Sequence, residues 1–220
     1  MRQELLHKYI KGSGIEIGAL HNPSAVPTDI KVKYIDRLPV SELRRQYPEL
    51  ADKPLVQVDI IDDGERLTSV ANSSQDFIIA NHFLEHCQDP IGTLKTFHRV
   101  LVIGGIAFIA VPDKLHSFDI NRPITPLWHL RLDHAIGPWL SRKTHFKEWA
   151  VLVNRAPKSE AEKQSKKLME GAYSIHFHVW DEPAIKKFFE YICTKVGFKL
   201  EIIQRNDTEI IVILLKLTST

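Results

Sequence analysis

Short apolar runs alternate with amphipathic segments through the first half of the chain. The runs expected to form buried strands are residues 15–17, 32–35, 55–58, 77–80 and 106–111. Apolar runs of this length between polar turns indicate strands buried on both faces. Their alternation with helical segments predicts βαβ units, and therefore a parallel sheet with helices on both sides.

Two helices are predicted to start at an acid followed closely by a proline. Asp89 precedes Pro90 and a series of apolar residues at helical spacing, and Gly104 is expected to stop this helix. Asp181 begins a second helix, which Gly197 stops. An acid at the N-cap accepts a hydrogen bond from the first turn, and proline fits the first helical positions.

The C-terminal part predicts a β-hairpin, formed by residues 198–203 and 209–217. The fold class is therefore α/β. We expect a Rossmann-like three-layer sandwich with a seven-stranded, mostly parallel sheet that closes on a C-terminal antiparallel strand. Residues 1–220 are expected to form one domain, with residues 113–180 as an insertion after strand five.

This insertion, residues 113–180, differs in composition from the rest of the chain. All four tryptophans and six of the eleven histidines lie within it. Its charged stretch, residues 158–170, is predicted to be a solvated helix or a mobile excursion. We therefore interpret the insertion as an elaboration of the core that forms a substrate-side lid.

Composition narrows the classes of protein. The net charge is +2 and no basic block stands out, so nucleic acid is not an expected partner. The two cysteines allow at most one bridge, which favours a reducing cytoplasm. The N-terminus lacks the apolar core of a signal peptide, and no apolar run is long enough to span a membrane. The sequence predicts no oligomeric state.

Polar residues and glycine follow the predicted strands at their carboxyl ends, where an open parallel sheet binds its ligands. They are Glu16 with Gly18, Asp36 with Arg37, Asp59 with Ile60, and Asn81 with His82. Asp36 comes 20 residues after Glu16, where an acid can accept hydrogen bonds from both ribose hydroxyls. A dinucleotide fingerprint is absent, because Gly12 and Gly14 precede the first strand. The pattern therefore predicts a nucleoside-containing cofactor.

The runs GIEIGALHNP, YIDR, VQVDIIDDGERL and QDFIIANHFLEHCQDPIGTLKTFHRVLVIGGIAFIAVPDK resemble motifs of class I S-adenosylmethionine-dependent methyltransferases. The resemblance covers roughly residues 14–113 and implies S-adenosylmethionine as cofactor. It places Glu16, Gly18 and Ala19 near the methionine and ribose, Asp36 and Arg37 at the ribose hydroxyls, Asp59 and Ile60 at the adenine, and Asn81 and His82 at the reactive end.

The sequence departs from the family pattern at two of its glycines, where Leu20 and Asn22 stand. A catalytically inactive binding module is therefore one alternative. The run from His82 to His86 also matches H-x-x-E-H, a zinc-peptidase signature. It directly follows a predicted strand, so a metal-dependent hydrolase is a weaker alternative, and we expect Glu85 and His86 to fix the loop.

The acceptor is expected to be a small or sugar-like molecule that offers an oxygen or nitrogen atom. Histidine is the usual base for such groups near neutral pH. The candidates, all in the insertion, are His116, His129, His134, His176 and His178. In a helix His129 shares a face with Asp133, and His176 and His178 point the same way in an extended segment. Each could instead be a structural residue, and a metal site of histidines with a carboxylate is also conceivable, although no metal is predicted.

Overall fold

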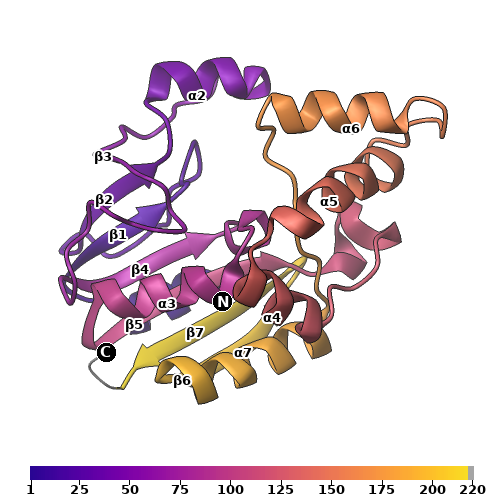
Figure 1. Ribbon diagram of the computed structural model, residues 1–220. Helices are drawn as coiled ribbons and strands as arrows, with labels where there is room; N and C mark the ends of the chain where they lie inside the picture. The colour runs from indigo at the N-terminus through magenta and orange to yellow at the C-terminus, as the bar shows by residue number, and fades with distance from the viewer. Residues whose placement is uncertain (218–220) are drawn as a thin grey trace.

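The computed structural model describes residues 1–217, and these residues contain a single seven-stranded sheet (Figure 1). The strand order is β3-β2-β1-β4-β5-β7-β6. β7 runs antiparallel to both neighbours, and the other six strands are parallel to one another. The strands are β1 (Ser13–Ile17), β2 (Lys31–Asp36), β3 (Ile60–Ile61), β4 (Gln75–Asn81), β5 (Leu101–Pro112), β6 (Phe198–Asn206) and β7 (Glu209–Lys216). The predicted mostly parallel sheet and terminal hairpin are confirmed.

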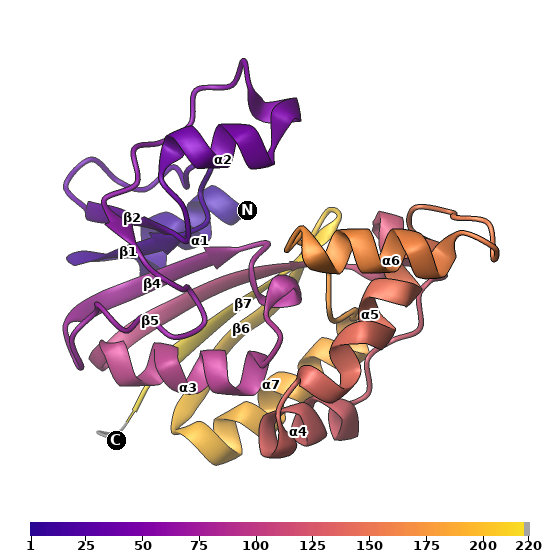
Figure 2. The same cartoon turned by 45° about the horizontal axis from the view of Figure 1, so that its top comes forward.

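Helices cover both faces of this sheet, which gives the predicted three layers (Figures 1 and 2). They are α1 (Arg2–Tyr9), α2 (Val40–Gln46), α3 (Pro90–Val100), α4 (Leu127–Ile136), α5 (Trp139–Leu152), α6 (Ala161–Glu170) and α7 (Glu182–Val196). Helices α3 and α7 pack on one face and α1 on the other. None of the helices in residues 1–217 has the length and apolar composition needed to cross a bilayer.

The central strands are buried on both faces, as their uninterrupted apolar runs predict. In β4, Ile78 and Ala80 belong to the larger core beneath α3 and α7. Phe77 and Ile79, which alternate with them, pack instead with Leu6 of α1 on the opposite face. The period of two in a strand thus distributes one apolar run between two cores.

Both predicted helix starts are confirmed by their caps. The carboxylate of Asp89 accepts a hydrogen bond of 2.9 Å from the backbone of Gly92, and Asp181 accepts one of 2.9 Å from Ala184. Helix α7 ends at Gly197, whose φ of +87° is the left-handed conformation that glycine adopts without strain.

The predicted end of α3 is wrong. The helix stops at Val100, and the chain passes directly into β5 at Leu101. Gly104, with φ of +81°, lies within β5, where the register against β4 is irregular between Gln75 and Phe77. The glycine therefore marks a bulge in a strand, which is a second common use of a residue that tolerates positive φ.

The third predicted strand, residues 55–58, is also wrong. Asp59 takes the backbone groups of Tyr34 that a ladder would use: its carboxylate accepts from Tyr34 N at 2.8 Å, and its own N–H donates to Tyr34 O at 2.9 Å. The ladder with β2 begins only at Ile60. Asp59 thus precedes β3 instead of ending it.

The insertion, residues 113–180, contributes α4, α5 and α6 together with short 3₁₀ turns. Helix α6 forms most of the charged stretch that the sequence predicts as a solvated helix or a mobile excursion. Helices α5 and α6 rise beside one end of the sheet, across from α2 (Figures 1 and 2). This arrangement leaves a hollow at the carboxyl ends of the parallel strands.

Candidate active site

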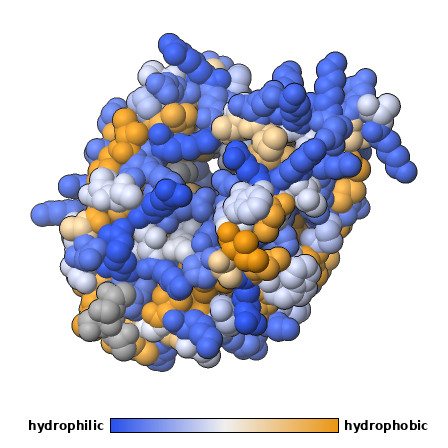
Figure 3. Space-filling model, in the orientation of Figure 1, coloured by the Kyte–Doolittle hydropathy of each residue, from blue (hydrophilic) through white to orange (hydrophobic). Residues whose placement is uncertain are grey.

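A cavity of about 370 Å³ lies at this carboxyl edge. One wall comes from the turns after β1, β2 and β3, the floor from the turn after β4, and the opposite wall from the insertion. The space-filling view shows the hollow between the side chains over α2 and those over α5 and α6 (Figure 3). A volume of this order suits a ligand of small-molecule size.

The turn after β1 brings backbone close to this cavity. Gly18 lines it with φ of +67°, and a Cβ at this position would meet no heavy atom of the described residues within 4 Å. Leu20, which replaces a family glycine, also lines it and holds a positive φ of 49°. The chain therefore keeps the left-handed turn of a glycine there while carrying a strained side chain.

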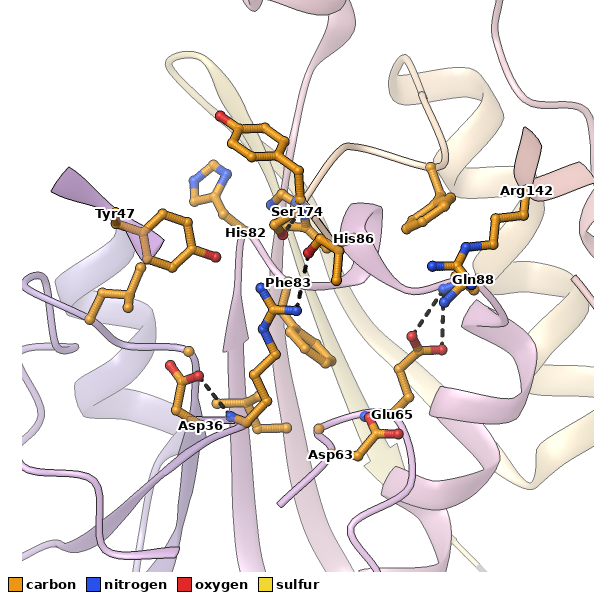
Figure 4. A pocket seen from close by; sticks show the side chains of 18 of the residues that line it. Asp36, Tyr47, Asp63, Glu65, His82, Phe83, His86, Gln88, Arg142 and Ser174 are labelled. Atoms are coloured by element: carbon orange, nitrogen blue, oxygen red, sulfur yellow. Dashed lines mark hydrogen bonds between the residues drawn. The ribbon is translucent and has the colours of Figure 1, made fainter. Parts of the chain in front are cut away.

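Asp36, at the end of β2, points into the same cavity (Figure 4). Its Oδ1 accepts a hydrogen bond of 2.7 Å from the backbone N–H of Arg37. Burial raises the pKa of the Asp36 carboxyl above its ordinary value. The Arg37 side chain reaches toward the insertion, with Nη1 3.5 Å from the carbonyl of Ala172.

Glu16, Ala19 and Asn81 lie outside the cavity lining. Glu16 and Asn81 instead make hydrogen bonds with Ser24, in the loop after β1. The buried Glu16 carboxylate accepts hydrogen bonds from the backbone (3.1 Å) and hydroxyl (2.8 Å) of Ser24, and burial raises its pKa. The amide of Asn81 donates to the same hydroxyl at 2.8 Å. These contacts tie the loop after β1 to the end of β4.

The displaced third strand also changes which residues reach the site. Asp59 and Ile60 lie outside the cavity lining, whereas Asp63 and Glu65, after the true end of β3, are part of it (Figure 4). The sequence IIDDGE contains the signal for this, since Ile60 and Ile61 are followed by acids. The hydrophobic pattern predicts the strand at residues 55–58 instead of 60–61 because residues 55–58 are also largely apolar.

His82 follows β4 and lines the cavity floor with a positive φ of 49°. Its Nε2 lies 3.0 Å from Glu209 of β7 and its Nδ1 3.5 Å from the buried Glu85. Hydrogen bonds to Glu209 and then Glu85 raise the pKa of His82 to about 9. The cavity therefore carries a cationic imidazole at neutral pH.

His86 lines the cavity too and has the opposite electrostatics. Its Nδ1 lies 2.9 Å from the carbonyl oxygen of Ile175 and 3.1 Å from the hydroxyl of Ser174 (Figure 4). The carbonyl can only accept, so Nδ1 carries the hydrogen and Nε2 keeps its lone pair. Burial lowers the pKa of His86, which makes it a neutral base at pH 7.

The sequence did not point to this role for His86. The residue was expected to fix its loop, and its contact with Ile175 does so. What brings it to the cavity is the return of the insertion across the end of β4, where Phe177 N donates to Glu85 O at 2.8 Å. A contact between segments about 90 residues apart leaves no local signal in the chain.

The five predicted catalytic histidines all lie outside the cavity lining. Each has a partner elsewhere: His116 near Asp113 (3.3 Å), His134 near Asp89 (2.8 Å), His176 near Asp119 (2.6 Å), and His129 with His178 in a cluster that includes His145. His129 also lies 3.1 Å from Asp133, so these two share a helix face as predicted. His176 and His178 belong to different clusters, and the catalytic roles of the five stay predictions.

The H-x-x-E-H run does not form a metallopeptidase helix. Leu84–His86 is a single 3₁₀ turn. The His82 imidazole faces Glu209 of β7, while the His86 imidazole faces Ile175 of the insertion. Two histidines that face different elements lack the common side on which such a helix binds zinc.

Solved structures with the same fold include S-adenosylmethionine-dependent methyltransferases. One from Methanosarcina mazei is 16% identical, with a TM-score of 0.50 over 98% of each chain. One from Thermotoga maritima, described as a possible histamine N-methyltransferase, is 17% identical, with a TM-score of 0.50 over 94% of this chain and 83% of that one. The CurJ carbon methyltransferase is 13% identical, with a TM-score of 0.51 over 95% of this chain, which spans 50% of that protein.

A comparison with curated protein sequences finds no match. The family model described as a methyltransferase domain matches residues 12–191, which is most of the chain. The site fits the cofactor of this family: Gly18 leaves open space beside its backbone, and Asp36 presents a carboxylate from the next strand. The chain therefore belongs to the methyltransferase-domain family and is an S-adenosylmethionine-dependent methyltransferase.

Proposed function

We propose that the protein methylates an oxygen or nitrogen atom of a small or sugar-like acceptor, and that His86 removes the acceptor's proton. The observation that carries this proposal is a neutral imidazole on the cavity wall with its tautomer fixed. Hydroxyl and ammonium groups need a base before or during transfer, and an imidazole held in one tautomer on the cavity wall can supply its lone pair.

The cofactor end of the cavity is the wall formed by the strand turns. Asp36 would accept hydrogen bonds from the ribose hydroxyls, and the open backbone at Gly18 would lie against the methionine and ribose part. Asp63 and Glu65, which line the cavity after β3, would receive the adenine end in place of Asp59. S-adenosylmethionine supplies an activated methyl group, so the protein's task is to align the acceptor and exclude water.

The acceptor end is the wall formed by the insertion. Phe146 and Phe177 pack edge to face, with their ring centroids 5.7 Å apart, and offer apolar surface. Tyr173 and Ser174 add hydroxyl groups to the same wall. Arg142 also lines this wall, and its buried Nε has no hydrogen-bond partner among the described residues. Aromatic surface with a few polar groups suits a small polar molecule or a sugar.

The cellular compartment and the class of acceptor are proposed from the cysteines and the net charge. Both cysteines, Cys87 and Cys193, are free thiols, which supports the reducing cytoplasm inferred from composition. The small net charge supports a small-molecule acceptor over a nucleic-acid polymer.

The test is transfer of a radiolabelled methyl group to a panel of amines, phenols, sugars and enolisable ketones. We expect turnover with an oxygen or nitrogen acceptor. We also expect His86→Gln to lower kcat by about 10²–10⁴-fold with a smaller change in KM. His7→Gln, at an exposed position on α1, is the matched control and should retain full activity.

Three outcomes would contradict parts of the proposal. Turnover only with the carbon acids would overturn the acceptor class. Equal activity of wild type and His86→Gln at all pH values would overturn the role of the base. Tight cofactor binding without turnover on any acceptor would favour the inactive binding module.

A further inference from the structure

Three histidines from three parts of the insertion meet outside the cavity. His129 lies on α4, His145 on α5, and His178 in the extended segment that precedes α7. One ring nitrogen from each lies within 4.8 Å of the other two. His145 and His178 are buried, and the His129 side chain is 20% exposed. The reaction proposed above uses none of the three.

The spacing of the nitrogens matches that of metal ligands. Nε2 of His129 and Nε2 of His145 are 3.1 Å apart. Two nitrogens bound tetrahedrally to zinc at about 2.0–2.1 Å stand about 3.3 Å apart, so little movement would be needed.

The third imidazole presents an unused nitrogen. Nε2 of His178 lies 3.4 Å from the carbonyl oxygen of Gln88, and its Nδ1 is buried without a hydrogen-bond partner among the described residues. Donation from Nε2 to the carbonyl leaves the lone pair on Nδ1. A second nitrogen bonded to a backbone carbonyl is the usual arrangement for a histidine that binds a metal.

A carboxylate lies beside one of the three imidazoles. Asp133 Oδ2 lies 3.1 Å from Nε2 of His129, one helical turn away on α4. The hydroxyl of Ser141 donates to both oxygens of Asp133 at 2.9 and 3.0 Å and so orients the carboxylate. Three imidazoles form a donor set suited to zinc, and the carboxylate adds a negative charge beside it.

We propose that His129, His145 and His178 bind one zinc ion that joins α4, α5 and the segment before α7. The protonation of the imidazoles agrees with this assignment. Burial lowers the pKa of His145 to about 3 and lowers that of His178 well below its ordinary value. Both are therefore in the neutral form that a metal requires.

The site has a structural consequence for the cavity. Phe146 directly follows His145 and Phe177 directly precedes His178, and both phenylalanines line the acceptor wall. A zinc ion that fixes the two histidines would hold this wall in place. The zinc site does not depend on the identity of the acceptor or on the role of His86.

The experiment is zinc analysis of the full chain without an affinity tag, after incubation with zinc and gel filtration. We expect about one equivalent in the wild type, less than a tenth of that in His129→Gln, and a melting temperature that rises by several degrees with zinc and falls back with a chelator. His134→Gln, on the same helix α4 but paired with Asp89, is the matched control and should retain the full equivalent.

Cobalt provides a second measurement that does not depend on any variant folding. The wild type should bind Co²⁺ with the visible absorption of a tetrahedral site, and zinc should displace it. Wild type that retains no more zinc than His129→Gln, or His134→Gln that loses as much as His129→Gln, would overturn the proposal. Absence of the cobalt absorption together with an unchanged melting temperature would overturn it as well.

Discussion

Replacement of Asp36 should weaken cofactor binding and stabilise the cofactor-free protein at the same time. Asp36 lines the cavity, and its carboxylate accepts backbone hydrogen bonds from Arg37 (2.7 Å) and Leu38, without an ion pair in the described structure. Burial raises its pKa, so the folded protein holds the ionised form less favourably than the unfolded chain does. A ligand with two hydroxyl donors would reverse that preference.

The magnitude follows from the hydrogen bonds that the carboxylate would make. A hydrogen bond to a charged group is worth about 1.5–3 kcal/mol, so Asp36→Ala should weaken binding of S-adenosylhomocysteine by about 10–150-fold. Asp36→Asn retains one acceptor oxygen and should cost about 3–10-fold. Titration calorimetry measures both values, and Asp29→Ala, at an exposed position, is the control that should leave affinity unchanged.

The same replacement of Asp36 should increase the stability of the cofactor-free protein. A carboxyl with a raised folded pKa contributes stability below its unfolded pKa and loses it as pH rises through the folded value. At pH 7 the ionised Asp36 therefore costs stability, and Asp36→Asn should raise the cofactor-free melting temperature by about 2–4 °C if the cost is about 1 kcal/mol. Unchanged affinity would refute the ribose assignment, and a lowered melting temperature would show that Asp36 is a structural residue.

Two further predictions concern stability. Asp181→Ala removes the cap of α7 and should cost about 1 kcal/mol in urea unfolding, whereas the exposed Asp52→Ala should cost less than about 0.5 kcal/mol; equal losses would exclude a capping role. His82 has a folded pKa of about 9 and an unfolded pKa of about 6.5, so its contribution is complete below pH 6.5 and is lost as pH rises through 9. The His82 side chain is 47% exposed, so solvent screening reduces the effect. We expect the free energy of unfolding of the wild type to fall by about 1–2 kcal/mol between pH 6 and 10. A fall of the same size in His82→Gln would refute this.

Much of the fold could be predicted from the sequence because local and global preferences agree. The apolar run in β4 is long enough to be buried on both faces, and Asp89 and Asp181 are caps whose partners lie three residues away. Such signals need only neighbours along the chain, so they can be found without coordinates. The mostly parallel sheet and its terminal hairpin followed from this pattern, whereas the methyltransferase family followed from the resemblance of the motifs.

The parts that failed depend on contacts between distant segments. Residues 55–58 are as apolar as a strand. However, the backbone N–H of Tyr34 donates to the carboxylate of Asp59, so the pairing of β3 with β2 begins only at Ile60. His86 becomes a cavity residue only because the insertion returns over β4. The histidines of the insertion were recognised as unusual, yet their division into separate clusters depends on how α4 and α5 pack.

The distribution of backbone strain supports a built site at this edge of the sheet. Seven residues other than glycine have positive φ among residues 1–217, and three of them, Leu20, His82 and Ala172, line the cavity. Each such conformation costs about 1 kcal/mol or more and persists only where the surrounding structure imposes it. Leu20 comes from the turn after β1 in the cofactor wall, His82 from the turn after β4 in the floor, and Ala172 from the insertion opposite. Strain on both sides of one cavity is expected if the chain is held to the shape of a ligand, whereas relaxed turns would do equally well for a fold alone. The loss of the glycine at position 20 therefore leaves the shape of the turn intact, which favours a working cofactor site over an inactive remnant.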